Sequence, residues 1–559
     1  MNIVNYSLPD ELKKRVSESI ANLKNTNTVE RIWKKDPKLW KENPSEDIEL
    51  SNRLGWLTLP SENIKRIKEF RDFADELKSD YEYVIVLGMG GSSLAPEVFA
   101  KTYGSEKGYP ALSILDSTHP AVVKKVLEHE DLNKTLFVVA SKSGGTAETM
   151  SFYYTIYEAL ANFLPLPGLQ MVVLTDPGSS LEKLAIEKGF RKIFNTPAEV
   201  GGRFSALSEY GLVPAAMIGM DLNIFLANAN NLADTCSPSF IDENNPGLYL
   251  GTLLGEAANT GIDKLTFIAS RSIESFPQWA EQLIAESTGK EDKGILPVTD
   301  EAFTNLNKYG SDRIFVYLRN DEDDNESLDE RVAELKSSGF PVIEIKMKDA
   351  YGLAEEFFRW EFATAVSGII LKINPFDQPN VQLAKTLANQ SLATYKNTGS
   401  LPSEKPDFEE SGISVFGTGD TKNLAVTFSR FFASIKSGDF VSLMAFLPYD
   451  DRIEAKLREL RTKVLEKYSV TTTSGYGPRF LHSTGQLHKG GPNNGLFIQI
   501  TDSIKEDIDV PGQNYTFGVL VTAQAQGDMK ALLQKERRVL RLHLNKNTLK
   551  ELDYIISCI

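Results

Sequence analysis

Cysteine and histidine are scarce in this sequence of 559 residues, and their spacing excludes several kinds of site. The two cysteines, Cys236 and Cys558, lie far apart, and the five histidines form no His-x-x-x-His pair. A zinc site is therefore not expected, because structural and catalytic zinc sites use closely spaced ligands. Two distant cysteines also favour a reducing compartment without structural disulfides.

Long hydrophobic runs and an excess of positive charge are also missing. No apolar run approaches the ~20 residues that a membrane-spanning helix needs. The first residues, Met-Asn-Ile-Val-Asn-Tyr, do not have the pattern of a signal peptide. The formal net charge of −15 argues against a nucleic-acid partner. We therefore expect a cytoplasmic protein with no nucleic-acid or membrane partner, in which local cations attract any anionic substrate.

Alternating strand and helix patterns indicate the domain organisation. The chain is too long for one hydrophobic core, and short apolar runs followed by polar turns and helical stretches are typical of doubly wound α/β domains with parallel sheets. We predict a helical lead-in over 1–60, a first α/β domain over 61–230 and a second over 231–398. A Ser-, Pro- and Glu-rich linker at 399–413 then opens a C-terminal block, 399–559, which we expect to complete the second domain.

The stretch 135–149 has the pattern of a phosphate-binding loop. A continuous apolar strand, Leu136–Ala140, leads into a loop of hydroxyls and glycines that ends where a helix begins. Hydroxyls and backbone amides beside a helix N-terminus suit a small phosphorylated ligand, although an ordinary strand-to-helix turn is the alternative. The candidate phosphate contacts are Ser141, Lys142, Ser143 and Thr146.

A second glycine-rich turn, Gly-Met-Gly-Gly-Ser-Ser at 88–93, follows the strand 84–87. It resembles the dinucleotide fingerprint Gly-x-Gly-x-x-Gly, but Ser93 stands where the third glycine is required. We therefore favour a small ligand over a nicotinamide cofactor, with Gly91 and Ser92 as candidate contacts.

Five dispersed motifs together carry a family resemblance. They are Gly-Met-Gly-Gly-Ser at 88–92, Ser-Lys-Ser-Gly-Gly-Thr-Ala-Glu-Thr at 141–149, Val-Gly-Gly-Arg-Phe-Ser at 200–205, Gln-Leu-Ile-Ala-Glu-Ser-Thr-Gly-Lys at 282–290 and Asn-Pro-Phe-Asp-Gln-Pro-Asn-Val-Gln-Leu-Ala-Lys at 374–385. Over roughly 55–559 the chain resembles the phosphoglucose isomerase family. More closely, it resembles the isomerase half of bacterial transaldolase and glucose-6-phosphate isomerase fusions, without the transaldolase barrel. This resemblance implies two sugar-isomerase (SIS) domains and no metal or organic cofactor.

The resemblance also implies roles for individual residues. Glu286 matches the family's proton shuttle, since aldose-to-ketose conversion moves one proton between neighbouring carbons through a cis-enediol. Arg203 would stabilise the developing enediolate oxygen. Gln282 and Gln378 are expected close to the sugar. Lys385, together with a histidine, matches the residues that open the sugar ring.

The histidine is where this sequence departs from the family pattern. The segment His-Ser-x-x-Gln-Leu normally lies between the glutamate and the lysine, but here it begins at His482, after both. The C-terminal block is therefore expected to be rearranged and to fold back onto the site, within one chain or across a homodimer. His488 is the alternative histidine, and we prefer His482 because only that position matches the spacing.

The expected activity is interconversion of glucose 6-phosphate and fructose 6-phosphate. An isomerase of another sugar phosphate, such as mannose 6-phosphate, and a non-catalytic sugar-phosphate-binding regulator are the competing hypotheses. A regulator would need only the phosphate loop, so the presence of Glu286, Lys385 and a matching histidine favours an enzyme.

Overall fold

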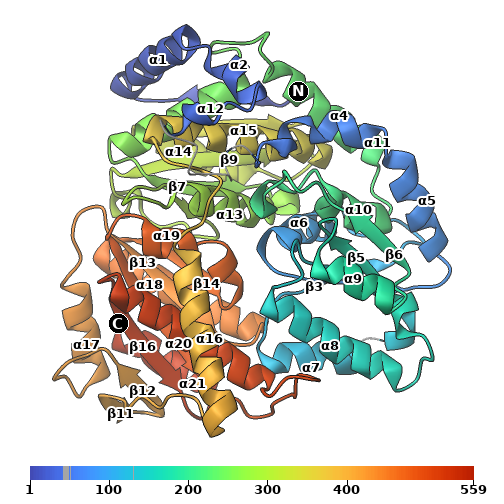
Figure 1. Cartoon of the computed structure of the whole chain (residues 1–559). Helices are drawn as coiled ribbons and strands as arrows, with labels where there is room; N and C mark the ends of the chain where they lie inside the picture. Colours follow the sequence, from blue (N-terminus) through green and yellow to red (C-terminus); the bar gives the residue numbers. More distant parts are fainter. Residues whose placement is uncertain (42–49, 51, 130) are drawn as a thin grey trace.

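The computed structural model describes residues 1–41, 50, 52–129 and 131–559, and in this part of the chain the strands form three sheets (Figure 1). Each sheet is mainly parallel, with helices packed on it, as predicted for α/β domains. The buried strands are continuously apolar because helices cover both faces of a parallel sheet. Every residue of β4 (Thr135–Ala140), for example, is buried. No helix in the described residues is long and apolar enough to cross a membrane.

The first sheet has the order β3-β2-β4-β5-β6 and is parallel throughout. Its other strands are β2 (Tyr83–Gly88), β3 (Ala111–Leu115), β5 (Met171–Thr175) and β6 (Lys192–Asn195). The helices that follow its strands along the chain are α6 (Leu94–Tyr103), α7 (Pro120–His129), α8 (Ala147–Ala161), α9 (Ser180–Glu187), α10 (Glu209–Met217) and α11 (Leu222–Thr235). The strand order changes direction between β2 and β4, and ligands of open α/β sheets bind at such a switch point. The two glycine- and serine-rich loops follow these two strands and therefore lie side by side.

The second sheet has the order β1-β10-β9-β7-β8. Its parallel strands are β7 (Lys264–Ala269), β8 (Leu296–Val298), β9 (Arg313–Asn320) and β10 (Val342–Met347). Its helices are α12 (Pro246–Asn259), α13 (Phe276–Thr288), α14 (Glu326–Ser337) and α15 (Leu353–Leu371), followed by α16 (Val381–Thr398).

The lead-in is not purely helical, which corrects our prediction for 1–60. The strand β1 (Ile3–Ser7) pairs antiparallel with β10 at the edge of the second sheet. The helices α1 (Asp10–Asn25), α2 (Thr28–Trp33), α4 (Leu59–Ile64) and α5 (Ile67–Leu77) follow. A run of five residues carries too weak a pattern of hydrophobicity to predict a strand from the sequence. β1 forms because β10 otherwise presents an unpaired edge of the second sheet.

The third sheet belongs to the C-terminal block alone, in the order β11-β12-β16-β15-β13-β14. Its strands are β11 (Phe408–Glu410), β12 (Ile413–Phe416), β13 (Phe440–Phe446), β14 (Thr471–Tyr476), β15 (Gly495–Asp502) and β16 (Arg538–Leu544). Its helices are α17 (Leu424–Phe432), α18 (Asp451–Tyr468), α19 (Gly485–Gly490), α20 (Phe517–Gln534) and α21 (Thr548–Cys558). The block therefore adds no strand to the second sheet, and the expected linker already belongs to the third sheet from Phe408 onward.

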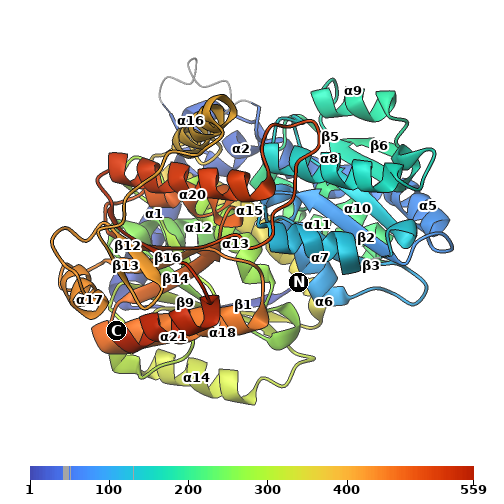
Figure 2. The ribbon, with the colours of Figure 1, turned by 90° about the horizontal axis from the view of Figure 1, so that it is seen from below.

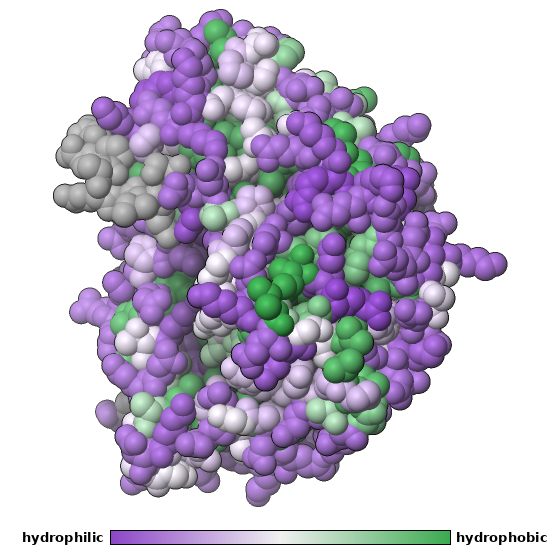
Figure 3. All heavy atoms as spheres, turned by 45° about the vertical axis from the view of Figure 1, so that its right-hand side comes forward, coloured by the Kyte–Doolittle hydropathy of each residue, from purple (hydrophilic) through white to green (hydrophobic). Residues whose placement is uncertain are grey.

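The C-terminal block nevertheless shares an apolar cluster with the second domain. Leu296 and Val298 of β8 pack in one cluster with Leu487 of α19 and Phe497 of β15. The helices α16 and α20 lie side by side across the two parts (Figure 2). On the face drawn in Figure 3, hydrophilic side chains predominate and apolar ones form small separate groups. The three sheets are thus joined through buried apolar contacts, and the loops that carry the motifs lie where they meet.

Candidate active site

The loop after β2 is held against the turn that carries Arg203. Gly90 has a φ of +57°, a conformation that glycine adopts without strain. A Cβ atom on Gly91 would lie 2.0 Å from the Gly202 carbonyl oxygen, so this position has no room for a side chain. Ser92 follows directly and is half-buried. The close approach of the two turns brings the expected small-ligand loop next to Arg203.

Hydroxyl groups define the shape of the loop after β4. Ser141 Oγ accepts a hydrogen bond from the Gly144 amide and lies 3.2 Å from Thr146 Oγ1. Ser143 Oγ accepts from the Gly145 amide. Thr146 immediately precedes α8, where backbone amides and the helix dipole favour an anion. The local geometry therefore suits the phosphate group expected from the sequence.

Lys142 does not point at this loop as a free cation. Its Nζ lies 2.6 Å from an Asp176 carboxylate oxygen and donates to the Ala198 carbonyl oxygen. The positive charge is thus already paired. Attraction for an anion at this loop comes from amides, hydroxyls and the N-terminus of α8.

Glu286 and Arg203 lie buried together between the first two domains. Glu286 is on α13 and only 5% exposed, and its Oε2 lies 3.7 Å from Arg203 Nη1. Arg203 also donates to Ser287 Oγ and to the Pro375 carbonyl oxygen. These bonds hold the guanidinium in one orientation beside the carboxylate. A fixed cation at this place can stabilise an oxyanion that forms next to Glu286.

The loop that precedes α16 completes the surroundings of Arg203. Arg203 Nη1 donates to Gln378 Oε1 at 3.4 Å, and Nη2 donates to the Asp377 carbonyl oxygen. Gln378 itself is exposed. Lys290 holds the same loop, with its Nζ 2.7 Å from Asp377 Oδ1 and 2.6 Å from the Asn374 carbonyl oxygen. Burial, reinforced by the nearby charge of Arg203, lowers the pKa of Lys290 to about 7.

His482 reaches the first domain from the C-terminal block of the same chain. Its Nε2 lies 2.9 Å from Oε1 of Glu148, near the start of α8. Burial alone would raise the pKa of Glu148, but His482 and the charge of Lys385 outweigh it and hold that pKa at about 2. Gln524 of α20 also donates to Glu148 Oε1, at 2.7 Å. Glu148 is therefore a charged hydrogen-bond acceptor that fixes the imidazole.

Gln282 joins the two halves of this arrangement. Its Nε2 donates to Glu286 Oε2 at 3.2 Å and to the backbone carbonyl oxygen of His482 at 2.7 Å. One amide group thus links the buried carboxylate of Glu286, in the second domain, to the turn that carries His482, in the C-terminal block.

Among the described residues, the other two candidates make no hydrogen bond to Glu286, Arg203 or Glu148. His488 is packed against the rings of Phe480 and Phe497, and burial lowers its pKa well below the usual range. Such a histidine is neutral and belongs to the core of the C-terminal block. Lys385 is exposed on α16, and it is connected to the centre through its electrostatic effect on Glu148.

Three residues of the site were missed by the sequence analysis: Glu148, Lys290 and Gln524. Glu148 and Lys290 both stand inside motifs that carry the family resemblance, so each could have been singled out from its motif. Gln524 had no such signal, because it lies in an ordinary helical stretch and reaches Glu148 across 376 positions of the chain.

The fold and the site together define the class of proteins built from paired sugar-isomerase (SIS) domains. The sequence model described as phosphoglucose isomerase matches residues 67–302. A probable glucose-6-phosphate isomerase of Natronomonas pharaonis is 30% identical over 348 residues, which are 56% of this chain and 79% of that protein. A glucose-6-phosphate isomerase of Leptospira interrogans is 27% identical over 406 residues, 64% of this chain and 88% of that protein. The chain belongs to the phosphoglucose isomerase family.

Solved structures agree with this assignment of the fold. A hypothetical protein of Thermus thermophilus superposes with a TM-score of 0.59 and 26% identity, covering 70% of this chain and all of that one. A glucose-6-phosphate isomerase of Chlamydia trachomatis gives a TM-score of 0.52 at 18% identity, covering 66% of this chain and 78% of that one.

Proposed function

We propose that this protein is a glucose-6-phosphate isomerase that interconverts glucose 6-phosphate and fructose 6-phosphate through a cis-enediol. One observation carries the proposal: Gln282 bonds both to Glu286, which lies beside Arg203, and to the turn of His482, which faces Glu148. An acid–base carboxylate, a fixed cation and a histidine are thereby grouped at the loops that suit a phosphate.

Ring opening is the first chemical step. The proton of the anomeric hydroxyl must leave while a proton is added to the ring oxygen, as the bond between the anomeric carbon and that oxygen breaks. His482, oriented by Glu148, takes part in this exchange. Lys385 is the second candidate proton donor, because its charge acts on the same region.

Isomerisation of the open chain follows at Glu286. The carboxylate takes the proton from C2 of the aldose, the electron pair forms the C1–C2 double bond, and the C1 oxygen gains negative charge. Arg203 lies where it can stabilise that charge. A proton passes between the two oxygens, and Glu286 then returns its proton to C1, which gives the ketose.

The phosphate group anchors the substrate throughout. Ser92, Ser141, Ser143 and Thr146 offer hydroxyls at the switch point of the first sheet, and in this proposal Gln282 and Gln378 contact the sugar. The contacts with the phosphate group are the same in the ground state and the transition state, so they contribute to substrate affinity more than to turnover.

His482 faces Glu148 of its own chain, so in this proposal the histidine acts within its own chain. The scarcity of cysteine supports a cytoplasmic location.

A coupled assay tests the proposal. Purified protein should convert fructose 6-phosphate into glucose 6-phosphate, detected by NADP⁺ reduction with a glucose-6-phosphate dehydrogenase. Mannose 6-phosphate in place of fructose 6-phosphate, with the matching detection enzyme, tests the alternative substrate. Binding of fructose 6-phosphate without turnover of either sugar would instead identify a regulator.

A further inference from the structure

The loop after β3 consists of polar residues that are all buried. Its members, Asp116, Ser117, Thr118 and His119, are each at most 5% exposed. The loop begins where β3 ends, so it lies at the carboxyl edge of the first sheet, the edge that also carries the proposed phosphate loop. Buried polar groups need hydrogen-bond partners, and the C-terminal block supplies them here.

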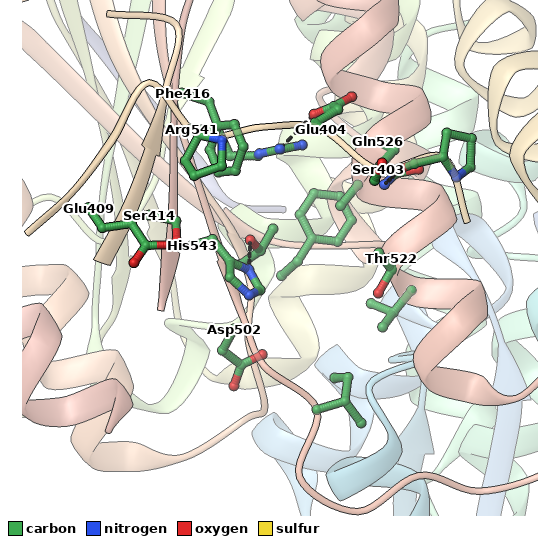
Figure 4. Close-up of a pocket in the computed structure, with 17 residues that line it drawn as sticks. Ser403, Glu404, Glu409, Ser414, Phe416, Asp502, Thr522, Gln526, Arg541 and His543 are labelled. Carbon is green, nitrogen blue, oxygen red and sulfur yellow. Dashed lines mark hydrogen bonds and ion pairs between the residues drawn. The ribbon is translucent and has the colours of Figure 1, made fainter. Parts of the chain in front are cut away.

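Two of these contacts come from α20 and from the end of β15. Thr118 Oγ1 donates to Gln524 Oε1 at 2.8 Å, and the amide nitrogen of the same Gln524 donates to Glu148. Asp502 lines a cavity of about 320 Å³ between the third sheet and α20 (Figure 4), and its Oδ1 lies 3.2 Å from His119 Nε2. Thr118 thus fixes the orientation of the amide that holds Glu148.

The ionic contact of this loop comes from Arg479, three residues before His482. Arg479 Nη1 lies 3.1 Å from Asp116 Oδ2, and Nη2 is paired with Glu97 of α6. The hydroxyl of Tyr449 donates to the other oxygen of Asp116 at 3.0 Å. One guanidinium therefore bridges two carboxylates of the first domain, a forked geometry that the single ammonium of a lysine does not reproduce.

Both carboxylates are largely removed from water. The side chains of Asp116 and Glu97 are 1% and 15% exposed, and that of Arg479 is 18% exposed. Burial alone would raise the pKa of Glu97, but Arg479 and Lys101 outweigh it and hold that pKa at about 2. Burial raises the pKa of the more deeply buried Asp116, and Arg479 opposes this shift. Breaking such a pair leaves a buried charge uncompensated, so Arg479 is held more firmly than in a surface ion pair.

Arg479 and His482 are the first and last residues of one short 3₁₀-helix, so the position of one restricts the other. At the His482 end, the backbone carbonyl oxygen accepts a hydrogen bond from Gln282. Gly90 packs against this end, because a Cβ atom there would lie 2.9 Å from the same oxygen. The turn 479–482 is therefore fixed at both ends, and its imidazole is directed at Glu148.

We propose that Arg479 is a positioning residue, which anchors the turn 479–482 on the loop 116–119 and so places the imidazole of His482 opposite Glu148. The inference rests on the proposed function, in which His482 takes part in ring opening. The same loop holds Glu148 through Thr118 and Gln524, so one buried loop sets both members of the pair.

NMR of the ligand-free full chain tests this placement without any activity. The chain has five histidines, so labelling histidine with ¹³C at Cε1 gives few signals, and His482→Asn identifies the signal of His482. In Arg479→Met, the His482 signal should move toward its position in Glu148→Gln, which lacks the charged partner.

Ring opening can also be measured apart from isomerisation, because opening and reclosing the ring interconverts the α and β anomers of glucose 6-phosphate. In Glu286→Gln, exchange NMR follows this anomerisation above the uncatalysed rate. Adding Arg479→Met should lower the catalysed rate at least about tenfold, since a misplacement of about 1 Å can cost ~10²-fold. The Kd for glucose 6-phosphate should stay unchanged, because the phosphate loop is untouched.

Arg538→Met is the matched control. Arg538 pairs with Asp439 at 2.8 Å inside the C-terminal block, and the two side chains are 25% and 4% exposed. The substitution removes a partly buried ion pair of the same kind, and it should change neither the His482 signal nor the anomerisation rate.

Arg479→Met may be unable to fold only because Asp116 is left unpaired. In that case Arg479→Met is combined with Asp116→Asn, which removes the buried charge, while Glu97 keeps Lys101 at 2.7 Å. The double variant should show the same shift of the His482 signal and the same loss of anomerisation.

An unmoved His482 signal, an unchanged anomerisation rate, or a loss of affinity equal to the loss of rate would each overturn the positioning role. Absence of anomerisation in Glu286→Gln alone would instead contradict the proposed function. The His482 signal would then still decide whether Arg479 places the imidazole.

Discussion

Replacement of Glu148 by glutamine should separate ring opening from isomerisation. The substitution keeps the size of the side chain but removes the charge that His482 Nε2 faces at 2.9 Å. A hydrogen bond to a charged group is worth roughly 1.5–3 kcal/mol, and ~1.4 kcal/mol corresponds to a tenfold change in rate. We therefore expect kcat/KM for fructose 6-phosphate, which is mostly cyclic, to fall about 10- to 100-fold.

The same variant should act almost normally on a substrate that has no ring to open. Erythrose 4-phosphate is an aldose phosphate that cannot form a five-membered ring, because the oxygen that would close the ring carries the phosphate. Glu286 and Arg203 are left untouched by the substitution, so the isomerisation step itself should keep its rate. The measurement compares kcat/KM for the two substrates in wild type and Glu148→Gln, with product formation followed by NMR.

Glu158→Gln is the matched control, because Glu158 is exposed on the same helix. It should leave both rates unchanged. Equal losses of activity on the cyclic and the open-chain substrate in Glu148→Gln would refute the assignment of ring opening to the His482–Glu148 pair. Wild-type activity on both would remove Glu148 from the mechanism.

The remaining predictions concern the base, the phosphate loop and acid stability. Glu286→Gln should cut turnover at least ~10²-fold and lower exchange of the C2 hydrogen with solvent in step, whereas wild-type exchange measured by NMR would exclude this carboxylate as the base. Thr146→Ala should mainly raise KM in the coupled assay, since it removes a contact made alike in both states, and a loss confined to kcat would contradict a phosphate role. The pKa of Glu148 is lowered from 4.5 to about 2, so its contribution to folding stability is complete above pH 4.5 and is lost as the pH falls toward 2. Between those pH values, the free energy of unfolding of Glu148→Gln, measured with denaturant, should therefore depend less on pH than that of the wild type. If the free energies of unfolding of the two proteins change with pH in parallel, folding does not lower the pKa of the Glu148 carboxyl group.

The sequence by itself determined the class of the fold and the chemistry to look for. The apolar run of β4, followed by hydroxyls and glycines, predicts a buried parallel strand and a turn into a helix, and the structure has both. Anion binding by this loop stays a prediction. These features are local, because strand periodicity, turn chemistry and helix starts depend on residues that are neighbours in the chain. Through its resemblance to the family motif, the segment around Glu286 likewise predicts a proton-transferring carboxylate.

Only the tertiary structure decided which of the candidate residues meet. His482 contacts Glu148 across 334 positions, and Gln524 contacts it across 376. The same packing pairs Lys142 with Asp176, places Lys385 on an exposed helix face and gives the C-terminal block its own sheet. No local sequence pattern predicts these contacts and positions. They depend on how the three sheets bury their shared apolar surfaces, which brings distant loops together.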